Sequence, residues 1–320
     1  MPADVNQSRP IAIIGAGSIG LAWAIVFARA KFPVQLYDPS ADQLARAKSA
    51  VAERLARLEH YGLLDEMPDA LLARVTLCDS EEKSVANASH VQENAPEDLA
   101  LKKQLMARLD RFADPAAGIA SSTSTIPASQ WASGLPGRER CLNVHPGNPP
   151  YLLPVVELIP APFTASRITE AVRDLMTLVG QKPILVAKEI EGFVFNRLQG
   201  AVLREAYCLV RDGVATVEDI DTVMREGLGL RWSFMGPFET VDLNTNGGIE
   251  KHAARLGPAY ARMGKERGQD DPWTPDLVAA VLAQRRARMP LEKWAERGLW
   301  RDEMLMKLRA LRAADKPKAP

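Results

Sequence analysis

Near its start the chain carries three closely spaced glycines between a short aliphatic run and a helical pattern, in IAIIGAGSIGLAWAIVFARA at residues 11–30. Gly15 permits a tight turn after a strand, Gly17 lets a pyrophosphate approach the backbone, and Gly20 lets the following helix pack closely on the strand. A G-x-G-x-x-G pattern often arises by chance, but a strand–turn–helix context is the one in which it binds a dinucleotide. The sequence therefore predicts a dinucleotide-binding unit, with an ordinary glycine-rich turn as the alternative.

The helix after the glycines is predicted to begin at Ser18 and Ile19, where free backbone amides and a partial positive charge favour phosphate groups. Asp38 closes the next aliphatic run, VQLYD, about twenty residues beyond the glycines. A carboxylate at this position accepts hydrogen bonds from an adenosine ribose and repels a 2′-phosphate, which favours NAD over NADP. Alternatively, Asp38 caps a helix, because Asp before Pro is also a good helix start. We predict NAD as the cofactor.

Short aliphatic runs alternate with amphipathic helical patterns through the first half of the chain. Seven runs are predicted to be buried strands: residues 11–15, 34–38, 75–78, 90–94, 118–122, 141–145 and 155–159. Long helical patterns lie between several of them, as at residues 41–62 and 99–113. This alternation builds a parallel sheet with right-handed crossovers. The sequence thus predicts an α/β fold that opens with a Rossmann-type, doubly wound and mostly parallel sheet.

From about Gly192 onward the pattern becomes helical throughout. In GFVFNRLQGAVLREAYCLVRDG, apolar residues recur with the three-and-four spacing of one buried helical face. These residues are Phe195, Leu198, Val202, Ala206 and Leu209. We place the domain boundary near Lys188, with an NAD-binding domain at residues 1–188 and an all-α domain at residues 189–320.

Composition narrows the class of partner. Lysine plus arginine equals aspartate plus glutamate, at 40 each, so nothing in the charge balance points to nucleic acid or a membrane surface. The three cysteines, Cys78, Cys141 and Cys208, form no C-x-x-C pair, so we expect no metal site, no disulfide framework and a reducing compartment. The N-terminal residues lack a signal-peptide pattern, and no apolar run reaches the ~20 residues that span a bilayer. We predict a cytoplasmic protein with a small-molecule ligand.

His145 ends a predicted strand and is followed by PGNPPY. Because prolines cannot continue a sheet ladder, the histidine is left at the carboxyl end of a strand, where open α/β sheets place their ligand crevice. Glu157 lies in the aliphatic run PVVELIP, where an unpaired carboxylate would carry a large desolvation cost. A nearby imidazole is its natural partner, which the carboxylate would orient for proton transfer. Spacing alone leaves open that Glu157 lies on an exposed edge and that His145 merely caps a strand.

Along nearly its whole length the chain resembles the 3-hydroxyacyl-CoA dehydrogenase family. The resemblance rests on GAGSIG, LYD, QENAPEDLALKK, SSTST, HPGNPPYLLPVVELIP, GFVFNRLQ, GLGLRWSFMGPFET and WRDEML. Within the family these stretches are most similar to the lambda-crystallin branch, which includes L-gulonate 3-dehydrogenase, and L-carnitine dehydrogenase is a near relative. The resemblance implies NAD-dependent oxidation of a secondary alcohol and a homodimer formed largely through the helical domain.

The resemblance also implies roles for single residues. His145 would be the general base that takes the hydroxyl proton while hydride leaves for the nicotinamide, and Glu157 would be its paired carboxylate. Ser124, in SSTST, corresponds to a serine that hydrogen-bonds the substrate oxygen, and Asn196, in GFVFNR, to an asparagine that helps position the substrate. Alternatively, Ser124 caps the helix expected at IPASQW, and Asn196 caps or turns the start of its own helix.

Further positions take their expected roles from the same resemblance. Glu97 and Lys102, in APEDLALK, correspond to cofactor contacts, and the alternative is an exposed pair at a helix start. Gly147 departs from the family pattern, which has a bulkier residue there, and this implies more space beside His145.

Arg231, in GLGLRWSFMGP, bears on the substrate. The carnitine and gulonate branches carry an arginine and an aromatic residue there, which implies that Arg231 holds a substrate carboxylate through a bidentate contact. The alternative is an arginine that bonds local carbonyls between helices. We therefore predict oxidation of the 3-hydroxyl of a small L-3-hydroxy acid, L-gulonate- or carnitine-like. A short-chain L-3-hydroxyacyl-CoA is the alternative substrate, and a catalytically idle, crystallin-like structural protein is the alternative of another class.

Overall fold

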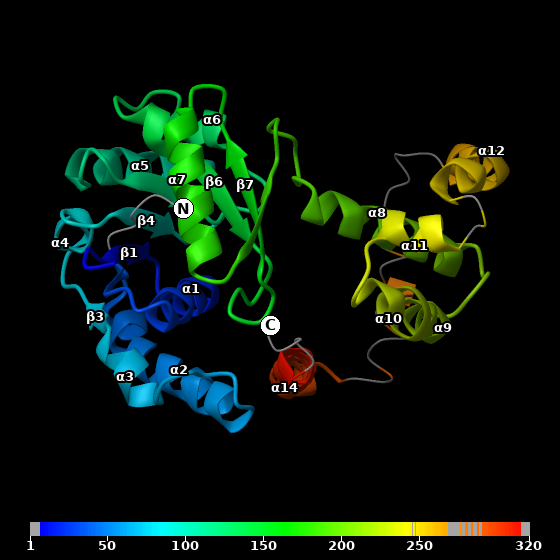
Figure 1. Ribbon diagram of the computed structural model, residues 1–320, viewed down its shortest axis with the longest axis horizontal. Helices are drawn as coiled ribbons and strands as arrows, with labels where there is room; N and C mark the ends of the chain where they lie inside the picture. Colours follow the sequence, from blue (N-terminus) through cyan, green and yellow to red (C-terminus); the bar gives the residue numbers. More distant parts are fainter. Residues whose placement is uncertain are drawn as a thin grey trace, which may run out of the picture. The chain divides into compact units, whose positions relative to one another are not determined.

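The computed structural model describes residues 7–314, apart from residues 245 and 247 and most of the stretch 268–289. The chain divides into two compact units, drawn in Figure 1. Unit 1 comprises Met1–Arg197 and Gly298–Pro320, and unit 2 comprises Leu198–Arg297. The boundary predicted near Lys188 lies a few residues before this division. The single predicted cut does not anticipate that the last part of the chain returns to unit 1.

Unit 1 is built on an eight-stranded sheet with the order β3-β2-β1-β4-β5-β6-β7-β8. The strands are β1 (Ile11–Ile14), β2 (Val34–Tyr37), β3 (Val75–Leu77), β4 (His90–Glu93), β5 (Gly118–Ser121), β6 (Cys141–Pro146), β7 (Val155–Pro160) and β8 (Lys182–Leu185). Strands β1 to β6 pair in parallel, β7 runs antiparallel to β6, and β8 is parallel to β7. The order of the first six is that of doubly wound dinucleotide-binding sheets. The predicted α/β class and the seven predicted strands are confirmed.

The eighth strand, β8, is not among those predicted from the sequence. It lies at the edge of the sheet, contains Pro183, and is largely exposed. Proline cannot donate a ladder hydrogen bond, so within sheets it is confined mainly to edge strands. A short, exposed strand that contains proline lacks the buried aliphatic pattern by which the other seven were recognised.

Helices cover both faces of the sheet (Figure 1). On one face lie α1 (Ser18–Arg29), α2 (Ala41–His60), α3 (Pro68–Ala73) and α7 (Ser166–Leu178), and on the other lie α4 (Glu81–Val85), α5 (Leu99–Phe112) and α6 (Ala128–Ala132). Successive strand side chains point to opposite faces, so Ile11 and Ile13 join the first core and Ala12 and Ile14 join the second. Burial on both faces explains why β1 reads as an unbroken aliphatic run.

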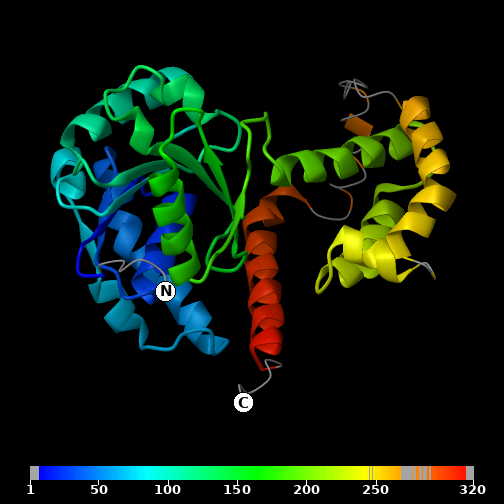
Figure 2. The same ribbon diagram turned by 45° about the horizontal axis from the view of Figure 1, so that its top comes forward.

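The last helix, α14 (Trp294–Ala314), belongs to unit 1 from Gly298 onward. Met306 on this helix is 2% exposed and joins the core cluster that contains α1 and α2. The Arg309 guanidinium donates a hydrogen bond to the Leu152 carbonyl oxygen at 2.7 Å. Figure 2 shows α14 in red along unit 1. The predicted helical domain therefore does not retain its C-terminal segment.

Unit 2 is helical in its described residues. Its elements are α8 (Phe195–Arg211), which begins in unit 1, α9 (Val217–Thr222), the π-helical turn η2 (Val223–Leu228), α10 (Gly229–Trp232), α11 (Pro237–Leu243), α12 (Gly248–Arg267) and the short 3-10 turn η3 (Leu291–Lys293). This agrees with the predicted all-α class. No helix in the described parts of either unit has the length and apolar character needed to cross a bilayer.

The apolar face of α8 is where the sequence prediction was wrong. The helix is present, but none of the five predicted face residues is buried, and Leu198 is 61% exposed. Cys208 is the buried residue of this helix. The three-and-four spacing identifies a face that needs covering, but it does not tell whether the same chain supplies the cover.

His90 on β4 makes the stability of unit 1 depend on pH. It is 2% exposed, its Nε2 lies 3.0 Å from Oε1 of Gln92, and its Nδ1 has no partner among the described residues. Burial lowers the pKa of His90 to about 4, against the opposing effect of the Gln92 hydrogen bond. Because the unfolded chain binds this proton near pH ~6.5, up to about 3 kcal/mol of stability is lost as the pH falls from that value toward 4.

We therefore expect His90→Gln to flatten the pH dependence of the free energy of unfolding between pH 7 and pH 4.5. Urea unfolding of wild type and variant at both values measures this. The same loss of stability on acidification in both proteins would show that the charge on His90 does not matter.

Candidate active site

The carboxyl ends of β1, β4, β5 and β6 lie at one edge of the sheet, because these strands are parallel. The chain order reverses between β1 and β4, and open α/β sheets bind ligands outside the carboxyl ends at such a point. The glycine turn follows β1, Glu97 follows β4, and Ser124 follows β5. His145 is the second-to-last residue of β6, which ends at Pro146. The fold therefore brings these sequence-predicted residues to one edge.

The glycine turn has the shape that a pyrophosphate requires. Gly15 has φ +100°, which an L side chain rarely adopts, and a Cβ on Gly20 would lie 1.8 Å from the Gly15 carbonyl oxygen. A Cβ on Gly17 would meet no atom of a described residue within 4 Å, so its backbone faces open space in this part of the structure. No side chain of a described residue caps the N-terminus of α1, which begins at Ser18, so its first amides are available to an anion. These residues fit the phosphates of a dinucleotide.

Asp38 lies just past β2 and is 9% exposed. Its Oδ2 accepts a hydrogen bond from the Ala16 amide at 2.7 Å, and its Oδ1 accepts one from the Ser40 amide at 2.8 Å. Ser40, not Asp38, caps α2, since its hydroxyl accepts from the Gln43 amide. The alternative of Asp38 as the helix cap is thus not realised. The carboxylate braces the glycine turn and places a negative charge at the end of β2.

We expect Asp38→Ser to narrow the preference for NAD over NADP by at least about tenfold, because like charges ~4 Å apart repel by ~1 kcal/mol in water and more near a protein surface. Asp38→Asn is the matched control, since it removes the charge and keeps the shape. The measurement is kcat/KM with each cofactor. A wild type that prefers NADP, or variants with the wild-type ratio, would show that Asp38 does not read the ribose.

His145 and Glu157 form a buried pair. In the antiparallel ladder of β6 and β7 the two residues lie directly opposite each other, so their side chains share one face. Nδ1 of His145 lies 2.7 Å from Oε2 of Glu157. His145 is 6% exposed and Glu157 1% exposed. Of the two arrangements that spacing allowed, the structure has the paired one, and neither residue lies on an exposed edge.

The second carboxylate oxygen of Glu157 is also held. Its Oε1 accepts hydrogen bonds from the amides of Val194 at 2.8 Å and Phe195 at 3.0 Å, at the start of α8. Burial acts to raise the pKa of Glu157, but the hydrogen bonds from His145 and the two amides outweigh it and hold this pKa below its ordinary value. The carboxylate is therefore ionised near neutral pH and favours a proton on Nδ1 of the imidazole.

The remaining ring nitrogen of His145, Nε2, makes no hydrogen bond to any described residue. The rings of Phe193 and Phe195 lie with their centroids 5.5 Å and 6.5 Å from that of His145. An imidazole fixed at Nδ1 by a carboxylate and walled by aromatic rings is arranged to accept a proton at Nε2.

Glu97 organises the loop after β5. Its Oε1 accepts hydrogen bonds from the Thr123 hydroxyl, from the Ser124 amide at 3.1 Å, and from both the amide and the hydroxyl of Thr125, at 2.9 Å and 2.7 Å. Burial acts to raise the pKa of Glu97, but the hydrogen bonds from the two threonines hold it below its ordinary value. Glu97 is thus an anion that fixes the backbone at Ser124.

Ser124 and Asn196 are brought together across this loop. Asn196 Nδ2 donates to the Ser124 carbonyl oxygen at 3.4 Å, a long bond. Ser124 does not cap the next helix, because the N-cap of α6 is Pro127 and no side chain caps it. The Ser124 hydroxyl makes no hydrogen bond to a described residue, whereas the Asn196 side-chain amide is already engaged with the Ser124 carbonyl oxygen.

Comparison with known families assigns both halves of the chain. Residues 10–190 match the family model for 3-hydroxyacyl-CoA dehydrogenase, NAD binding domain, and residues 192–291 match that for 3-hydroxyacyl-CoA dehydrogenase, C-terminal domain. The chain belongs to the 3-hydroxyacyl-CoA dehydrogenase family. It is an NAD-dependent dehydrogenase.

Relatives within this family confirm the branch predicted from the sequence. The lambda-crystallin homolog of Rattus norvegicus is 38% identical over 311 residues, covering 96% of this chain and 97% of that protein. The L-carnitine dehydrogenase of Pseudomonas aeruginosa is 38% identical over 283 residues, covering 87% and 84%. The solved structure of a 5-formyl-3-hydroxy-2-methylpyridine 4-carboxylic acid 5-dehydrogenase, an NAD-dependent dismutase, has a TM-score of 0.81 at 28% identity, covering 95% and 98%.

Lys102 forms its ion pair with Glu93 and not with Glu97. The residue is 1% exposed, and its ammonium lies 2.8 Å and 2.7 Å from the two oxygens of Glu93, which is fully buried. The Ser121 hydroxyl donates to the same carboxylate at 2.5 Å, and the Ala95 amide does so at 2.6 Å. An exposed pair of Lys102 with Glu97, one alternative from the sequence, is therefore not present.

Glu93 and Ser121 were missed by the sequence reasoning. They end β4 and β5, and together with Lys102 they tie the two loops that carry Glu97 and Ser124 to the sheet. The available signal was a carboxylate and a hydroxyl at the ends of two strands that are predicted to be buried, since a buried charge requires a partner.

The segment after His145 folds back tightly. A Cβ on Gly147 would lie 3.1 Å from both Leu153 Cβ and Val155 Cγ1. The peptide bond between Asn148 and Pro149 is cis. The extra space that the missing side chain implied beside His145 is therefore taken by the chain's own residues.

Arg231 lies on α10 in unit 2 and is exposed. Among the described residues its guanidinium makes no hydrogen bond to a local carbonyl, so the alternative role that the sequence left open is not found.

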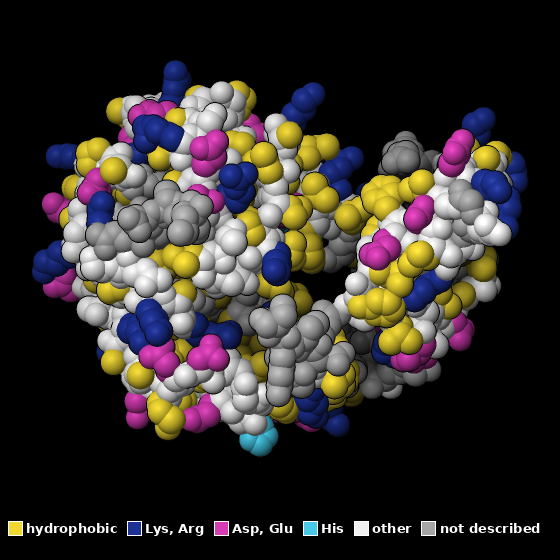
Figure 3. All heavy atoms as spheres, viewed as in Figure 1, with side chains coloured by type: hydrophobic (Ala, Val, Ile, Leu, Met, Phe, Trp, Pro, Cys, Tyr) yellow, Lys and Arg dark blue, Asp and Glu magenta, His cyan; other side chains and the backbone are white. Residues whose placement is uncertain are grey.

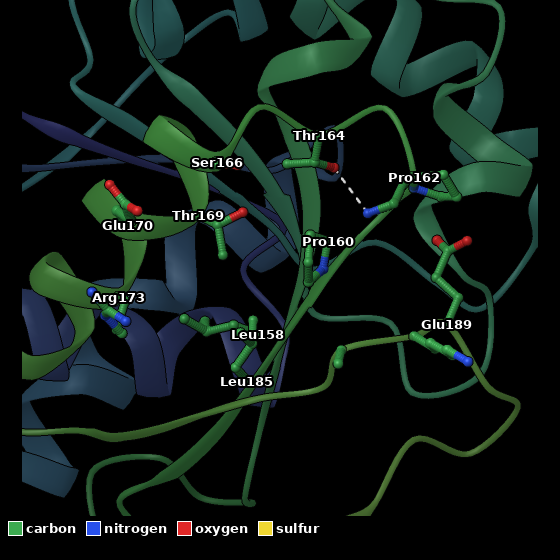
Figure 4. Close-up of a pocket in the computed structure, with 13 residues that line it drawn as sticks. Leu158, Pro160, Pro162, Thr164, Ser166, Thr169, Glu170, Arg173, Leu185 and Glu189 are labelled. Atoms are coloured by element: carbon green, nitrogen blue, oxygen red, sulfur yellow. Dashed lines mark hydrogen bonds between the residues drawn. The ribbon is translucent and has the colours of Figure 1, made fainter.

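A hollow of about 660 Å³ lies elsewhere on unit 1, between α7 and the strands β7 and β8 (Figure 4). Glu170 and Arg173 stand on its α7 side, and Glu189 stands on the opposite side. None of the sequence-predicted site residues lines it. The residues that carry chemistry gather at the carboxyl edge of the sheet instead.

Proposed function

We propose that this dehydrogenase oxidises the 3-hydroxyl group of a small L-3-hydroxy acid, L-gulonate- or carnitine-like. The proposal is carried by the hydrogen bond between His145 Nδ1 and Glu157 Oε2, which lie 2.7 Å apart. The substrate O–H proton passes to Nε2 of His145. The hydrogen on C3 leaves as a hydride, taking the electron pair of the C3–H bond, and the C3–O bond becomes a C=O double bond. NAD, when bound, accepts the hydride. Glu157 stabilises the imidazolium produced by this transfer.

Ser124 and Asn196 position the substrate oxygen in this proposal. Glu97 accepts a hydrogen bond from the Ser124 amide, and Asn196 donates one to the Ser124 carbonyl oxygen. These two bonds fix the backbone position from which the Ser124 side chain extends. A hydroxyl that donates to the forming carbonyl oxygen stabilises the charge that develops there.

Arg231 and the similarity to an L-carnitine dehydrogenase support a free acid over a thioester. L-Carnitine, on which one relative at 38% identity acts by its name, is a free acid. An exposed arginine without a local acceptor suits a substrate carboxylate, because its planar guanidinium meets both oxygens and stays charged at any working pH.

We expect Arg231→Met to raise KM for the acid by about 10- to 150-fold, the range of a charge-assisted hydrogen bond of ~1.5–3 kcal/mol, with a smaller effect on NAD affinity. The amide or methyl ester of the same acid should be a poor substrate for the wild type and insensitive to the substitution. Exposed Arg262, on α12, provides the matched control as Arg262→Met. Normal handling of the free acid by Arg231→Met would remove the carboxylate contact and favour an acyl-CoA substrate.

NADH formation across a substrate panel tests the function itself. The panel contains L-3-hydroxybutyrate, L-gulonate, L-carnitine and L-3-hydroxybutyryl-CoA. We expect the highest kcat/KM for a free hydroxy acid. A clear preference for the thioester would establish the acyl-CoA alternative. A protein that binds NAD but turns over no member of the panel would support the idle, crystallin-like role.

We further propose a homodimer formed through unit 2. Large apolar side chains are exposed on this unit, including Leu198 at 61%, Phe234 at 72% and Phe238 at 77%. Figure 3 shows hydrophobic side chains gathered over the part that contains α10 and α11. An apolar surface of this kind is typical of an obligate interface. Sedimentation equilibrium tests it, and a monomer at micromolar concentration would contradict it. The three cysteines of the sequence form no C-x-x-C pair, and this favours a reducing, cytoplasmic location.

A further inference from the structure

A second polar cavity lies within unit 1, and none of its residues belongs to the glycine turn or the catalytic pair. Its volume is about 220 Å³, well above the roughly 10–15 Å³ that one water needs but small for an extended organic ligand. Its walls come from the end of α1, the segment 150–154, the turn between α7 and β8, and α14.

Two arginines from opposite ends of the chain meet at this cavity. Arg29 lies in the last turn of α1, and Arg309 lies on α14. Asp65 is the one carboxylate among the described lining residues, so their charged side chains sum to +1. Arg309 also donates to the Leu152 carbonyl oxygen, which fixes its guanidinium at the wall.

Arg29 is partly buried and is not neutralised by a direct contact. Its guanidinium makes no hydrogen bond or ion pair with any described residue. Burial, and next the charge of Arg309, lower the pKa of Arg29, while Asp65 acts weakly in the opposite direction. Because burial and the charge of Arg309 both disfavour the charged form of Arg29, an anion placed between the two guanidiniums would stabilise that charge.

Gln181 adds an unsatisfied acceptor to the same wall. It is 5% exposed, its Nε2 donates to the Pro150 carbonyl oxygen at 3.2 Å, and its Oε1 has no hydrogen-bond partner among the described residues. Donors on two arginines beside a free acceptor complement a ligand that carries both anionic oxygens and a hydroxyl. A monoprotonated phosphate group has both.

We propose that this cavity binds a phosphate group, either as inorganic phosphate or as a small phosphate monoester, between Arg29 and Arg309. The ligand bridges α1 and α14 and so fastens the C-terminal helix to unit 1. The site is separate from the NAD phosphates and does not depend on the proposed substrate.

Calorimetric titration of the NAD-saturated protein with inorganic phosphate tests the proposal, because saturation occupies the glycine turn. We expect one phosphate per chain, and binding about tenfold or more weaker in Arg29→Met and in Arg309→Met. Arg167→Met, an exposed arginine on α7 outside the cavity, is the matched control and should bind as wild type does. Glycerol 1-phosphate in a parallel titration distinguishes the two ligand sources by which of them binds more tightly.

Melting temperature and NAD affinity check that each variant folds, and Arg29→Lys, which retains the charge, should keep most of the binding. Phosphate should also raise the melting temperature of wild type and of the Arg167 variant, and not that of Arg309→Met. No phosphate binding by the NAD-saturated wild type, or equal binding by all variants, would overturn the proposal.

Discussion

Replacing His145 with glutamine is expected to lower turnover at least ~100-fold, the scale of a positioned general base. Glutamine keeps a polar side chain opposite Glu157, so the fold and NAD affinity should be close to wild type. The physical reason is that Nε2 of His145 is the basic atom that the fixed Nδ1 leaves available. Steady-state kinetics on the best substrate of the panel, together with NAD binding measured by fluorescence, separates the catalytic effect from the structural one.

Glu157→Gln is the companion variant. It keeps the size of the side chain but removes the charge that faces His145 Nδ1 and the two amides of α8. We expect lower turnover and a changed pH profile of kcat/KM, since the imidazolium loses its counter-charge. Near-normal turnover in the His145 variant would falsify the general-base mechanism, whatever the Glu157 variant does.

The second large effect is expected for Gly20→Ala. A Cβ at this position would lie 1.8 Å from the Gly15 carbonyl oxygen, which is backbone and cannot rotate away. Overpacking of this kind costs about 3 kcal/mol or more, so we expect a melting temperature lower by about 5–10 °C and loss of measurable NAD binding.

Two glycines provide the controls for Gly20→Ala. A Cβ on Gly17 meets nothing within 4 Å, so Gly17→Ala should leave the melting temperature unchanged and weaken NAD binding alone, because the methyl group would stand where the pyrophosphate approaches. Gly134→Ala, on an exposed turn, should change neither. NAD affinity in Gly20→Ala equal to that of wild type would show that close packing of α1 on the turn is not required.

Local patterns were enough to predict most of unit 1. The glycine turn can be recognised because the strand, turn and helix signals are contiguous in residues 11–30. The unbroken aliphatic run of β1 indicates that the strand is buried on both faces. Strand β8 could not be predicted from the sequence, because it is largely exposed and contains Pro183. Periodicity predicted α8 correctly but not its exposure, which depends on what covers the helix rather than on its own sequence.

The site was predictable in its residue types and less so in its contacts. Spacing left the pairing of His145 with Glu157 open, and the ladder of β6 and β7 supplies it. The amides of Val194 and Phe195, which hold the second oxygen of Glu157, carry no sequence signal, because any residue has an amide. The partner of Lys102 likewise depends on three segments that meet only in the folded sheet.

The most direct test of hydride transfer from C3 follows the hydrogen that leaves the substrate. L-3-Hydroxy acid labelled with deuterium at C3, chosen as the best substrate of the panel, is incubated with NAD and the protein, and the NADH is analysed by mass spectrometry. We expect one deuterium in each NADH and a 3-keto acid as the other product, with both lowered at least ~100-fold when His145→Gln is used for the same time. NADH without deuterium, or no NADH from any hydroxy acid, would contradict hydride transfer from C3.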